Sequence, residues 1–255
     1  MPNVYGCRVL ENKKLTDSVY SITIESEPLA KESMPGQFLH IKCGDKNLLR
    51  RPISICSVSE KNIRLVFETK GEGTKWLSKQ NEHATLDILG PFGNGFKYPK
   101  GNIIVVGGGI GAPPMLYVAE QAKENESVTA ILGFRSANDI ILKEEFEKTC
   151  KKVQITTDDG SAGEHGQVTA PLEKLLKTGT YSGVMSCGPQ KMQEAIAKLS
   201  KKYNTPCQVS LEERMGCAVG ACLVCACEAT SSDGTKKMTR VCADGPVYDA
   251  KTVFP

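Results

Sequence analysis

The sequence contains Val105-Val106-Gly107-Gly108-Gly109-Ile110-Gly111-Ala112-Pro113-Pro114, and this stretch decides the fold of the second half of the chain. An apolar strand enters a glycine turn, and the turn leads into a helix that has proline in its first turn. Backbone N–H groups at such a helix start face an anion, so the stretch predicts a pyrophosphate site. The spacing is not the common G-x-G-x-x-G fingerprint, and a tight turn without a ligand stays open as the alternative.

Strands and helices alternate around this glycine turn. Apolar strands are expected near residues 102–106, 127–133, 153–157 and 183–186, and helices near 113–124, 142–150, 171–177 and 190–203. This alternation predicts an α/β domain with a doubly wound parallel sheet. The turn Cys187-Gly188-Pro189 follows the last strand, so we expect it at the same carboxyl edge of the sheet as Gly107 to Gly111.

The first 98 residues show a different pattern, with a period of two. Ile63, Leu65 and Phe67, for example, alternate with their neighbours, and turn residues separate such runs. This predicts a small antiparallel β barrel, interrupted by a short helix near residues 74–79. The segment 90–96 is rich in glycine and is expected to be a loop outside regular structure. We therefore predict three domains, over residues 1–98, 101–205 and 206–255.

Two polar segments stand out within the predicted barrel. Leu49-Arg50-Arg51-Pro52-Ile53-Ser54 places arginine and serine on an otherwise apolar strand, and the arginine fork suits a phosphate. A solvated pair of strand arginines is the alternative. Gly71-Glu72-Gly73-Thr74 then opens a short helix, which gives a second position for an anion.

Five of the eleven cysteines fall between positions 217 and 242. Four of them have the spacing C-x4-C-x2-C followed by a distant fourth cysteine, which is typical of plant-type 2Fe-2S clusters; they are Cys217, Cys222, Cys225 and Cys242. Small residues between them allow backbone N–H groups to approach the sulfurs. A zinc site is the alternative, although zinc sites usually pair two short C-x2-4-C hairpins. We interpret the fifth, Cys227, as a buried thiol that is not a ligand.

Charge, hydropathy and histidine spacing exclude several other classes. The net charge of +3 is spread without a basic block, which argues against nucleic-acid binding. No apolar run approaches the roughly 20 residues that span a bilayer, and the start of the chain lacks a signal-peptide core, so we expect a cytoplasmic protein without a membrane partner. The three histidines lack metal-ligand spacing, and His40 is expected to be a structural histidine with satisfied hydrogen bonds.

These motifs, in their order along the chain, resemble those of the ferredoxin-NADP reductase superfamily. The motif Glu213-Arg-Met-Gly-Cys217-Ala-Val-Gly-Ala-Cys222-Leu-Val-Cys225 and the segment Val241-Cys242-Ala-Asp-Gly-Pro-Val247 make the resemblance more specific. With them the chain resembles the electron transfer subunits of NAD-dependent dihydroorotate dehydrogenase B. The resemblance covers nearly the whole chain.

The resemblance implies the cofactors FAD, NAD(H) and a 2Fe-2S cluster, and it implies which residues hold them. The FAD site would comprise Arg51, Pro52, Ile53, Ser54, Val66, Phe67, Glu68, Gly73 and Thr74. Members of the superfamily commonly have tyrosine where Ile53 stands, so an aromatic stacking partner for the flavin is missing. The NAD(H) site would comprise Gly107, Gly108, Gly109, Ile110, Gly111, Cys187, Gly188 and Pro189. Arg135 could meet a 2′-phosphate, so the choice between NADH and NADPH stays open.

The resemblance also implies a partner and a place in pyrimidine biosynthesis. The partner would be an FMN-containing catalytic subunit that oxidises dihydroorotate to orotate, in a heterotetramer with two subunits of each kind. Two alternatives are a related flavin and iron-sulfur reductase subunit of an NADPH-ferredoxin, sulfide or hydrogenase complex, and a redox sensor or zinc-stabilised binding module without enzymatic activity. The second alternative leaves the glycine turns unexplained.

Overall fold

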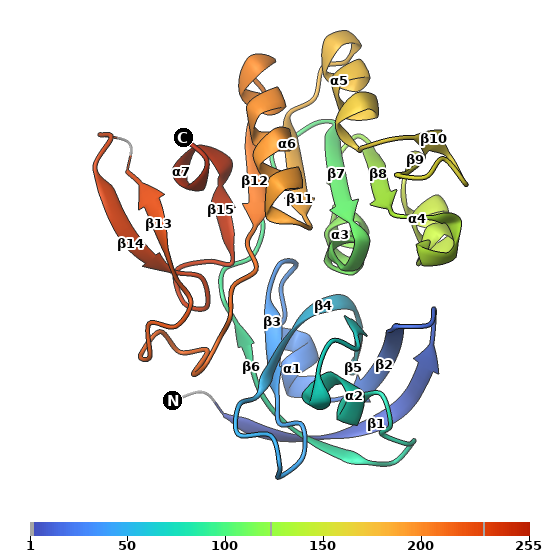
Figure 1. Ribbon diagram of the computed structural model, residues 1–255, viewed down its shortest axis with the longest axis vertical. Coiled ribbons are helices and arrows are strands. Elements are labelled where there is room, and N and C mark those ends of the chain that lie inside the picture. Colours follow the sequence, from blue (N-terminus) through green and yellow to red (C-terminus); the bar gives the residue numbers. More distant parts are fainter. Residues whose placement is uncertain (1–2, 123, 232) are drawn as a thin grey trace.

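The computed structural model describes residues 3–122, 124–231 and 233–255. It contains a closed six-stranded barrel, a seven-stranded sheet with helices on both faces, and a two-stranded hairpin that stands beside them (Figure 1). No helix in these ranges is long and apolar enough to cross a membrane. The predicted combination of a barrel and an α/β domain is confirmed.

The barrel is formed by the first six strands, in the order β1-β2-β5-β4-β3-β6. Their bounds are β1 Val4–Lys14, β2 Val19–Glu25, β3 Phe38–Ile41, β4 Arg51–Ser59, β5 Asn62–Glu68 and β6 Thr85–Phe92. Alternate side chains such as Leu39, Ile53 and Leu65 fill the interior. Two short helices, α1 Glu27–Glu32 and α2 Glu72–Leu77, lie between strands, and only α2 was expected from the sequence.

The expected loop over residues 90–96 is wrong for its first three residues, because β6 runs through Phe92. Phe92 pairs with Phe38 on β3, and the register shifts between Phe38 and His40. Gly90 has a φ of 141°, and a side chain there would come within 2.9 Å of Leu39. Glycine therefore serves here to bend the strand and to let it approach its neighbour, rather than to end it.

The sheet of the second half follows the predicted alternation. Its order is β10-β9-β8-β7-β11-β12-β15, and all neighbours are parallel except β12 and β15. The strands are β7 Ile103–Gly108, β8 Val128–Phe134, β9 Lys152–Thr157, β10 Glu164–His165, β11 Gly183–Cys187, β12 Cys207–Ser210 and β15 Val247–Asp249. The helices are α3 Ala112–Gln121, α4 Lys143–Thr149, α5 Thr169–Thr178, α6 Gln190–Lys202 and α7 Ala250–Val253.

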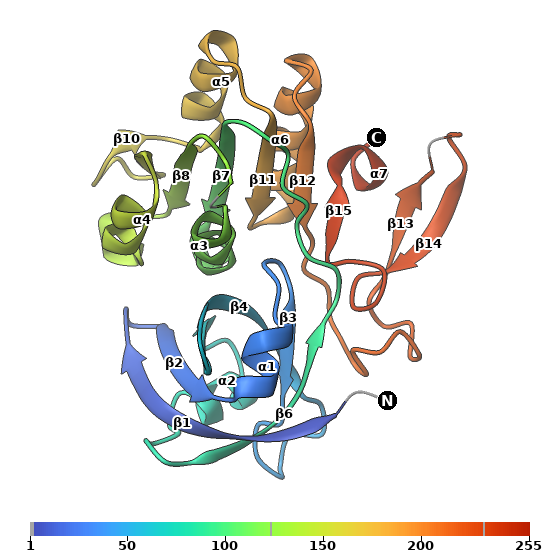
Figure 2. The ribbon, with the colours of Figure 1, turned by 180° about the vertical axis from the view of Figure 1, so that it is seen from behind.

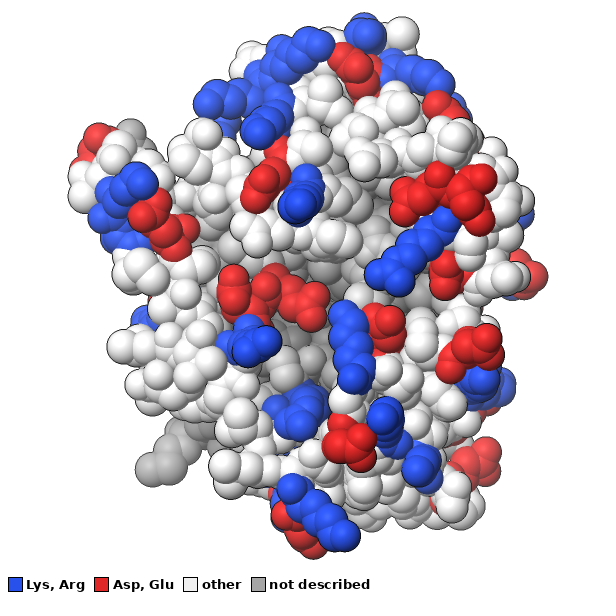
Figure 3. All heavy atoms as spheres, in the orientation of Figure 1, with Lys and Arg blue, Asp and Glu red and all other residues white. Residues whose placement is uncertain are grey.

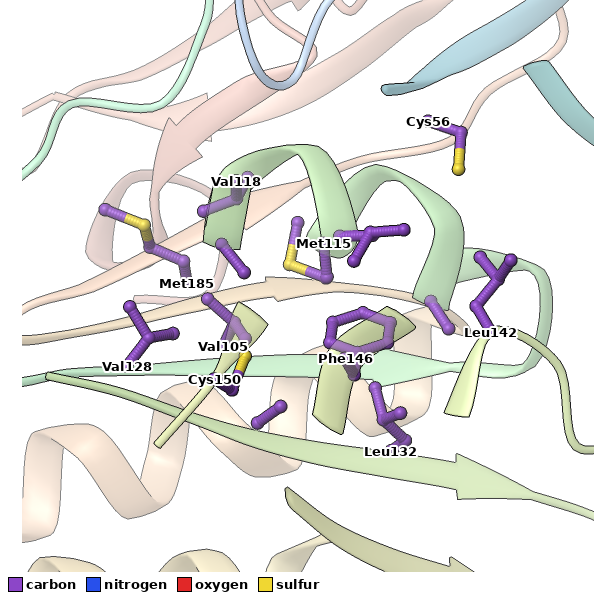
Figure 4. Close-up of a cluster of buried hydrophobic side chains, with 14 of the residues drawn as sticks. Cys56, Val105, Met115, Val118, Val128, Leu132, Leu142, Phe146, Cys150 and Met185 are labelled. Atoms are coloured by element: carbon purple, nitrogen blue, oxygen red, sulfur yellow. The ribbon is translucent and has the colours of Figure 1, made fainter. Parts of the chain in front are cut away.

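Helices α3 and α4 cover one face of the sheet, and α5, α6 and α7 cover the other. Each group of helices forms its own apolar core with the sheet. In the first core, Met115 and Val118 of α3 and Phe146 of α4 pack on Val105 and Leu132 of the sheet (Figure 4). Cys56 of the barrel reaches the same core. The barrel and the sheet therefore share buried apolar surface.

The cysteine-rich segment leaves the sheet and returns to it. Between β12 and β15 the chain forms the loops that carry Cys217, Cys222, Cys225 and Cys242, and the hairpin of β13 Ala226–Thr230 and β14 Lys236–Arg240. The predicted boundary at residue 206 falls directly before β12, a strand of the sheet, so we propose that the cluster domain begins after Ser210. Residues 1–2, 123 and 232 of the predicted domains lie outside the described residues.

The barrel contacts the rest of the chain on two sides (Figure 2). On one side, the Tyr117 hydroxyl of α3 donates to the Ser33 carbonyl at 2.9 Å, and Arg64 pairs with Glu145 of α4 at 3.3 Å. On the other side, Phe38 is buried together with four residues of the cysteine-rich segment, namely Ala218, Cys225, Val241 and Cys242.

Candidate functional site

The two glycine turns meet at the carboxyl edge of the sheet. Gly107 pairs with Cys187 across β7 and β11, and a methyl group added at Gly108 would lie 3.0 Å from Pro189. A methyl group at Gly111 would collide with the backbone of Cys187. Close packing explains the glycines at both positions: Gly111 lies against the backbone of the second turn, and Gly108 lies against the side chains of Met192 and Pro189.

The front of the first turn is open. Gly109 has a φ of 52°, and no atom lies within 4 Å of the position where its Cβ would be. The turn is followed by α3, a helix of ten residues whose first turn carries proline. Helix α3 itself leaves few N–H groups for a phosphate, because Ala112 N–H donates to the Gly109 carbonyl and the next two residues are prolines. The open turn before the helix therefore offers the backbone N–H groups that a phosphate would contact. This arrangement fits the pyrophosphate of a dinucleotide.

Within the barrel, the structure brings Arg51 and Gly73 together. A methyl group at Gly73 would lie 2.5 Å from Arg51 Nε, so the guanidinium occupies the space that a side chain would fill. Thr74 Oγ1 accepts the backbone N–H of Lys70 at 2.9 Å and donates to the Gly71 carbonyl at 3.1 Å, which fixes the chain before α2. Arg51 and Gly73, which the resemblance assigns to the FAD site, thus lie side by side.

The two strand arginines differ in their surroundings. Arg50 donates to the Asp87 carboxylate at 2.8 Å and to the Asp87 carbonyl at 2.9 Å, so it cross-links β4 to β6. Arg51 donates only to uncharged oxygens, those of Leu49, Arg50 and Asn47. Its positive charge has no carboxylate partner within the described ranges. Arg51 is therefore the arginine available for a phosphate.

Several predicted FAD residues have side chains that are buried in apolar cores. Ile53 and Phe67 belong to the core inside the barrel, and their exposed fractions are 8% and 2%. Val66 packs instead into the core shared with the sheet. Only the backbones of these residues could contact a flavin. The neighbouring Ser54 is half-buried and leaves its side chain partly exposed.

The four predicted cluster cysteines form two pairs. Cys217 N–H approaches Cys222 Sγ at 3.4 Å, and Cys222 N–H approaches Cys217 Sγ at 3.4 Å. Cys242 N–H approaches Cys225 Sγ at 3.5 Å. A two-iron cluster needs such an arrangement, because each of its irons takes two thiolates. In the described part of the chain, no three His, Cys, Asp or Glu side chains are arranged around one common metal position.

Backbone amides favour metal binding at the pair of Cys217 and Cys222, which we call the outer pair. Burial raises the pKa of the Cys217 thiol, but N–H groups of Cys222, Val219 and Ala221 outweigh this and lower the pKa to about 6. The loop can present these amides because Ala218 and Gly220 adopt positive φ, at 60° and 79°. N–H groups directed at sulfur stabilise a thiolate, which is the form that binds iron.

The two pairs differ in burial. Cys225 and Cys242 are each 1% exposed and belong to the small core around Phe38. Cys217 is half-buried and Cys222 is exposed. One side of the cluster position therefore faces the barrel, and the other side faces outward. Cys227 on β13 is half-buried and makes none of the N–H to sulfur contacts.

Arg240 and Asp244 hold this loop, and sequence analysis did not identify them. Arg240 donates twice to the Asp244 carboxylate, each time at 2.9 Å, and once to the Gly220 carbonyl at 3.2 Å. The ion pair lowers the pKa of Asp244 to about 2. The signal in the sequence is an arginine and an aspartate four residues apart on either side of Cys242.

The expectation that His40 has satisfied hydrogen bonds is wrong. The side chain is 1% exposed, and neither ring nitrogen has a hydrogen-bond partner within the ranges described. Burial, with a further contribution from Arg50, lowers the pKa of His40 to about 4. The ring lies edge-on to Phe92, with 6.4 Å between centroids. His40 is therefore a neutral, buried residue of the barrel that packs beside Phe92.

Comparison with protein families and curated proteins gives consistent results. Residues 212–254 match the iron-sulfur cluster binding domain of dihydroorotate dehydrogenase B, and residues 105–198 match the oxidoreductase NAD-binding domain. The electron transfer subunit of dihydroorotate dehydrogenase B (NAD(+)) from Caldanaerobacter subterraneus is 41% identical over 248 residues, 97% of each chain. The Listeria monocytogenes protein of the same name is 39% identical over 255 residues, 96% of this chain and 97% of that one.

Solved structures share the fold. A chain from the structure of an NADH-dependent reduced ferredoxin-NADP oxidoreductase superposes with a TM-score of 0.87 at 29% identity, over 99% of this chain and 91% of that one. A ferredoxin NADP+ reductase from Neisseria gonorrhoeae with bound FAD and NADP superposes with a TM-score of 0.66 at 18% identity, over 78% and 91%. The second comparison leaves out about a fifth of this chain.

Proposed function

The chain belongs to the family of electron transfer subunits of NAD-dependent dihydroorotate dehydrogenase B, and from this premise we propose how its residues carry electrons. The cofactors are FAD, a 2Fe-2S cluster and NAD(H). One observation supports the relay most directly: the buried pair of Cys225 and Cys242 packs against the barrel, while the outer pair of Cys217 and Cys222 is more exposed. A cluster held by these four cysteines would have one side toward the barrel and the other toward a partner, and it would supply one-electron transfer between them.

Each cofactor is assigned residues of this chain. Arg51, with Gly73 and Thr74, holds the FAD pyrophosphate, and the backbones of Pro52, Ile53, Val66, Phe67 and Glu68, with Ser54, line the flavin. The two glycine turns, Gly107 to Gly111 and Cys187 to Pro189, hold NAD(H). The 2Fe-2S ligands are Cys217, Cys222, Cys225 and Cys242.

When bound, FAD supplies exchange between a hydride and single electrons, and the cluster supplies one-electron transfer. The protein contributes position and charge. Arg51 neutralises the pyrophosphate, and the turn at Gly188 sets how closely a nicotinamide approaches the barrel. The N–H groups around Cys217 stabilise negative charge on sulfur. No side chain of this chain is required as an acid or base.

The relatives are named as electron transfer subunits, so a catalytic subunit is the partner. We propose that this partner carries FMN and that two subunits of each kind assemble. The exposed apolar side chains Val219, Leu223 and Val224 surround the outer cysteine pair, and their exposed fractions of 46%, 62% and 55% suit a surface that another protein covers. The thiol-rich composition agrees with the cytoplasmic location expected from the sequence.

An anaerobic NADH titration tests the function. The purified protein should show flavin and iron-sulfur absorption that both bleach on adding NADH, and absence of both bands would contradict the proposal. Gly111→Ala should abolish bleaching by NADH while dithionite still reduces both cofactors, because the added methyl group collides with Cys187. Gly6→Ala, whose methyl group would make only an ordinary 3.5 Å contact with Thr85, is the control and should bleach normally.

Co-expression identifies the partner. Together with a dihydroorotate dehydrogenase catalytic subunit, the chain should give a complex that forms orotate with NAD, and its mass should correspond to two subunits of each kind. The likeness to the reduced ferredoxin-NADP oxidoreductase chain keeps one alternative, a reductase subunit of another complex. Activity with NADPH and ferredoxin, without activity toward dihydroorotate in the co-expressed complex, would favour that alternative.

A further inference from the structure

The choice between NADH and NADPH depends on the adenine ribose, because the two nucleotides differ only in a 2′-phosphate. The position of this ribose follows from the strand order. The turn at Cys187 lies on β11, on one side of β7, so a nicotinamide at that turn directs the adenosine toward the other side, where β8 and β9 lie. Neighbouring strands are about 4.8 Å apart, so the ends of β8 and β9 lie about 5 and about 10 Å from the glycine turn.

Residues of opposite charge follow these two strands. Arg135 comes directly after β8, and Asp158 and Asp159 come directly after β9. Asp158 N–H donates to the Phe134 carbonyl at 3.1 Å, and Asp159 N–H donates to the Arg135 carbonyl at 3.2 Å. These bonds extend the pairing of β8 and β9 beyond the strands. The side chains of Arg135, Asp158 and Asp159 therefore belong to one exposed surface.

The two aspartates have different tasks. The Asp159 carboxylate accepts the Ser161 N–H at 2.9 Å and the Ser161 hydroxyl at 2.6 Å. Ser161 Oγ in turn accepts the Ala137 N–H at 2.7 Å, which links the loop after β9 to the loop after β8. The Asp158 carboxylate makes no hydrogen bond or ion pair with any described residue. Asp159 therefore shapes the surface, and Asp158 is free to contact a ligand.

The charges of this surface favour a hydroxyl over a phosphate. A carboxylate only accepts hydrogen bonds, and a ribose 2′-hydroxyl has one to donate. A 2′-phosphate carries nearly two negative charges and would meet two carboxylates against one guanidinium. We propose that Asp158 accepts the 2′-hydroxyl of the adenine ribose and makes the protein select NADH over NADPH. This inference rests on the proposed function, since it assumes a dinucleotide at the glycine turns.

Binding measurements on the FAD- and cluster-loaded protein test the proposal without turnover. NAD+ and NADP+ are titrated and followed by calorimetry, and the wild type should bind NAD+ at least about tenfold more tightly. Asp158→Ser should bind NADP+ about five- to tenfold more tightly and NAD+ a few-fold more weakly. 2′-Deoxy-NAD+ adds a second readout: the wild type should bind it more weakly than NAD+, and Asp158→Ser should bind both equally.

A distant charge variant separates a local contact from a general field effect. Asp17→Asn removes a fully exposed carboxylate at the turn between β1 and β2, where Lys14 is its one ion-pair partner among the described residues, and should leave the ratio of NAD+ to NADP+ affinities unchanged. The proposal would be overturned if Asp158→Ser and the wild type had the same ratio of NAD+ to NADP+ affinities. It would also be overturned if the wild type preferred NADP+. If the wild type binds neither nucleotide and NADH does not reduce it, the proposed function itself fails.

Discussion

The barrel contacts the sheet and the cluster segment through two junctions of different chemistry. The sheet junction combines apolar packing with directed polar contacts, namely the Tyr117 to Ser33 hydrogen bond and the Arg64 to Glu145 ion pair. The cluster junction places Phe38 against two of the proposed metal ligands, and beside them Asn94 donates to the carbonyls of Asp244 and Gly245. The first junction can form from the chain alone. The second contains residues whose state changes when iron binds, so its stability is linked to cofactor loading.

The largest effect is expected at the cluster junction. Cys242→Ser should lower iron content from about two per chain to nearly none, because an inner ligand of a four-cysteine cluster is lost. FAD content should stay normal, since Arg51 and Gly73 lie elsewhere on the barrel. Iron analysis and visible spectra measure both. Cys227→Ser is the matched control and should keep its iron; a normal iron content in Cys242→Ser would show that the fourth ligand is another residue.

Phe38→Ala should cost about 3 to 5 kcal/mol in free energy of unfolding, because it removes a buried aromatic ring from the same junction. Phe38 is 3% exposed. Urea denaturation gives the value, and the cluster should also be lost faster to a chelator. Leu48→Ala is the control, since Leu48 is 96% exposed and should change stability by less than about 0.5 kcal/mol. Equal effects of the two substitutions would contradict the proposed packing.

Tyr117→Phe probes the sheet junction. Removing the hydroxyl leaves the Ser33 carbonyl without its donor in a buried position, and this should cost about 1 to 2 kcal/mol. The aromatic ring stays, so packing is kept. Thermal unfolding should show the loss with iron and FAD contents unchanged. A variant that loses iron would mean that the two junctions are coupled.

The smallest effect is expected at Glu120, next to the ion pair of the sheet junction. Burial raises the pKa of Glu120, Arg64 opposes this, and the Glu145 carboxylate adds to it. A raised pKa means that the fold disfavours the ionised form of Glu120. The stability that the neutral carboxyl contributes is therefore fully present below the unfolded-state pKa and is lost as pH rises through the folded-state pKa. Glu120→Gln should therefore have no effect below the ordinary glutamate pKa and should stabilise above the raised one. The gain stays under about 1 kcal/mol because water screens a half-exposed group.

The dependence of this effect on pH shows whether it comes from the charge of Glu120. Melting temperatures of Glu120→Gln and wild type should coincide in acid and separate at neutral pH. A constant difference at every pH would mean that the effect comes from helix α3 and not from the charge of Glu120.

Local chemistry predicted most of the architecture and indicated the four cysteines that the structure brings together in two pairs. The alternation of strands and helices, the two glycine turns and the cysteine spacing all depend on short stretches, and short stretches are what a sequence displays directly. Gly107 to Gly111 and Cys187 lie about 80 residues apart, yet the rule for parallel strand ends correctly predicted that they meet.

The errors arose where a long-range contact changes the meaning of a residue. Gly90 indicated a loop, but Phe38 offers Phe92 a strand partner, so β6 continues. His40 appeared ordinary because nothing in its local sequence indicates that both of its ring nitrogens will be buried without a hydrogen-bond partner. The different tasks of Arg50 and Arg51 depend on Asp87, a residue on another strand. Such contacts form only when the whole barrel has closed.

The cluster segment begins at the end of β12 and finishes at β15, and these strands pair antiparallel, Ser210 with Val247. In topological terms, residues 211–246 are one long insertion in a β hairpin. Both attachment points lie side by side on a sheet that is complete without the insertion. A family with this topology can therefore gain, lose or exchange its iron-sulfur unit by replacing a single continuous segment, and the sheet beneath it would keep the pairing of its strands.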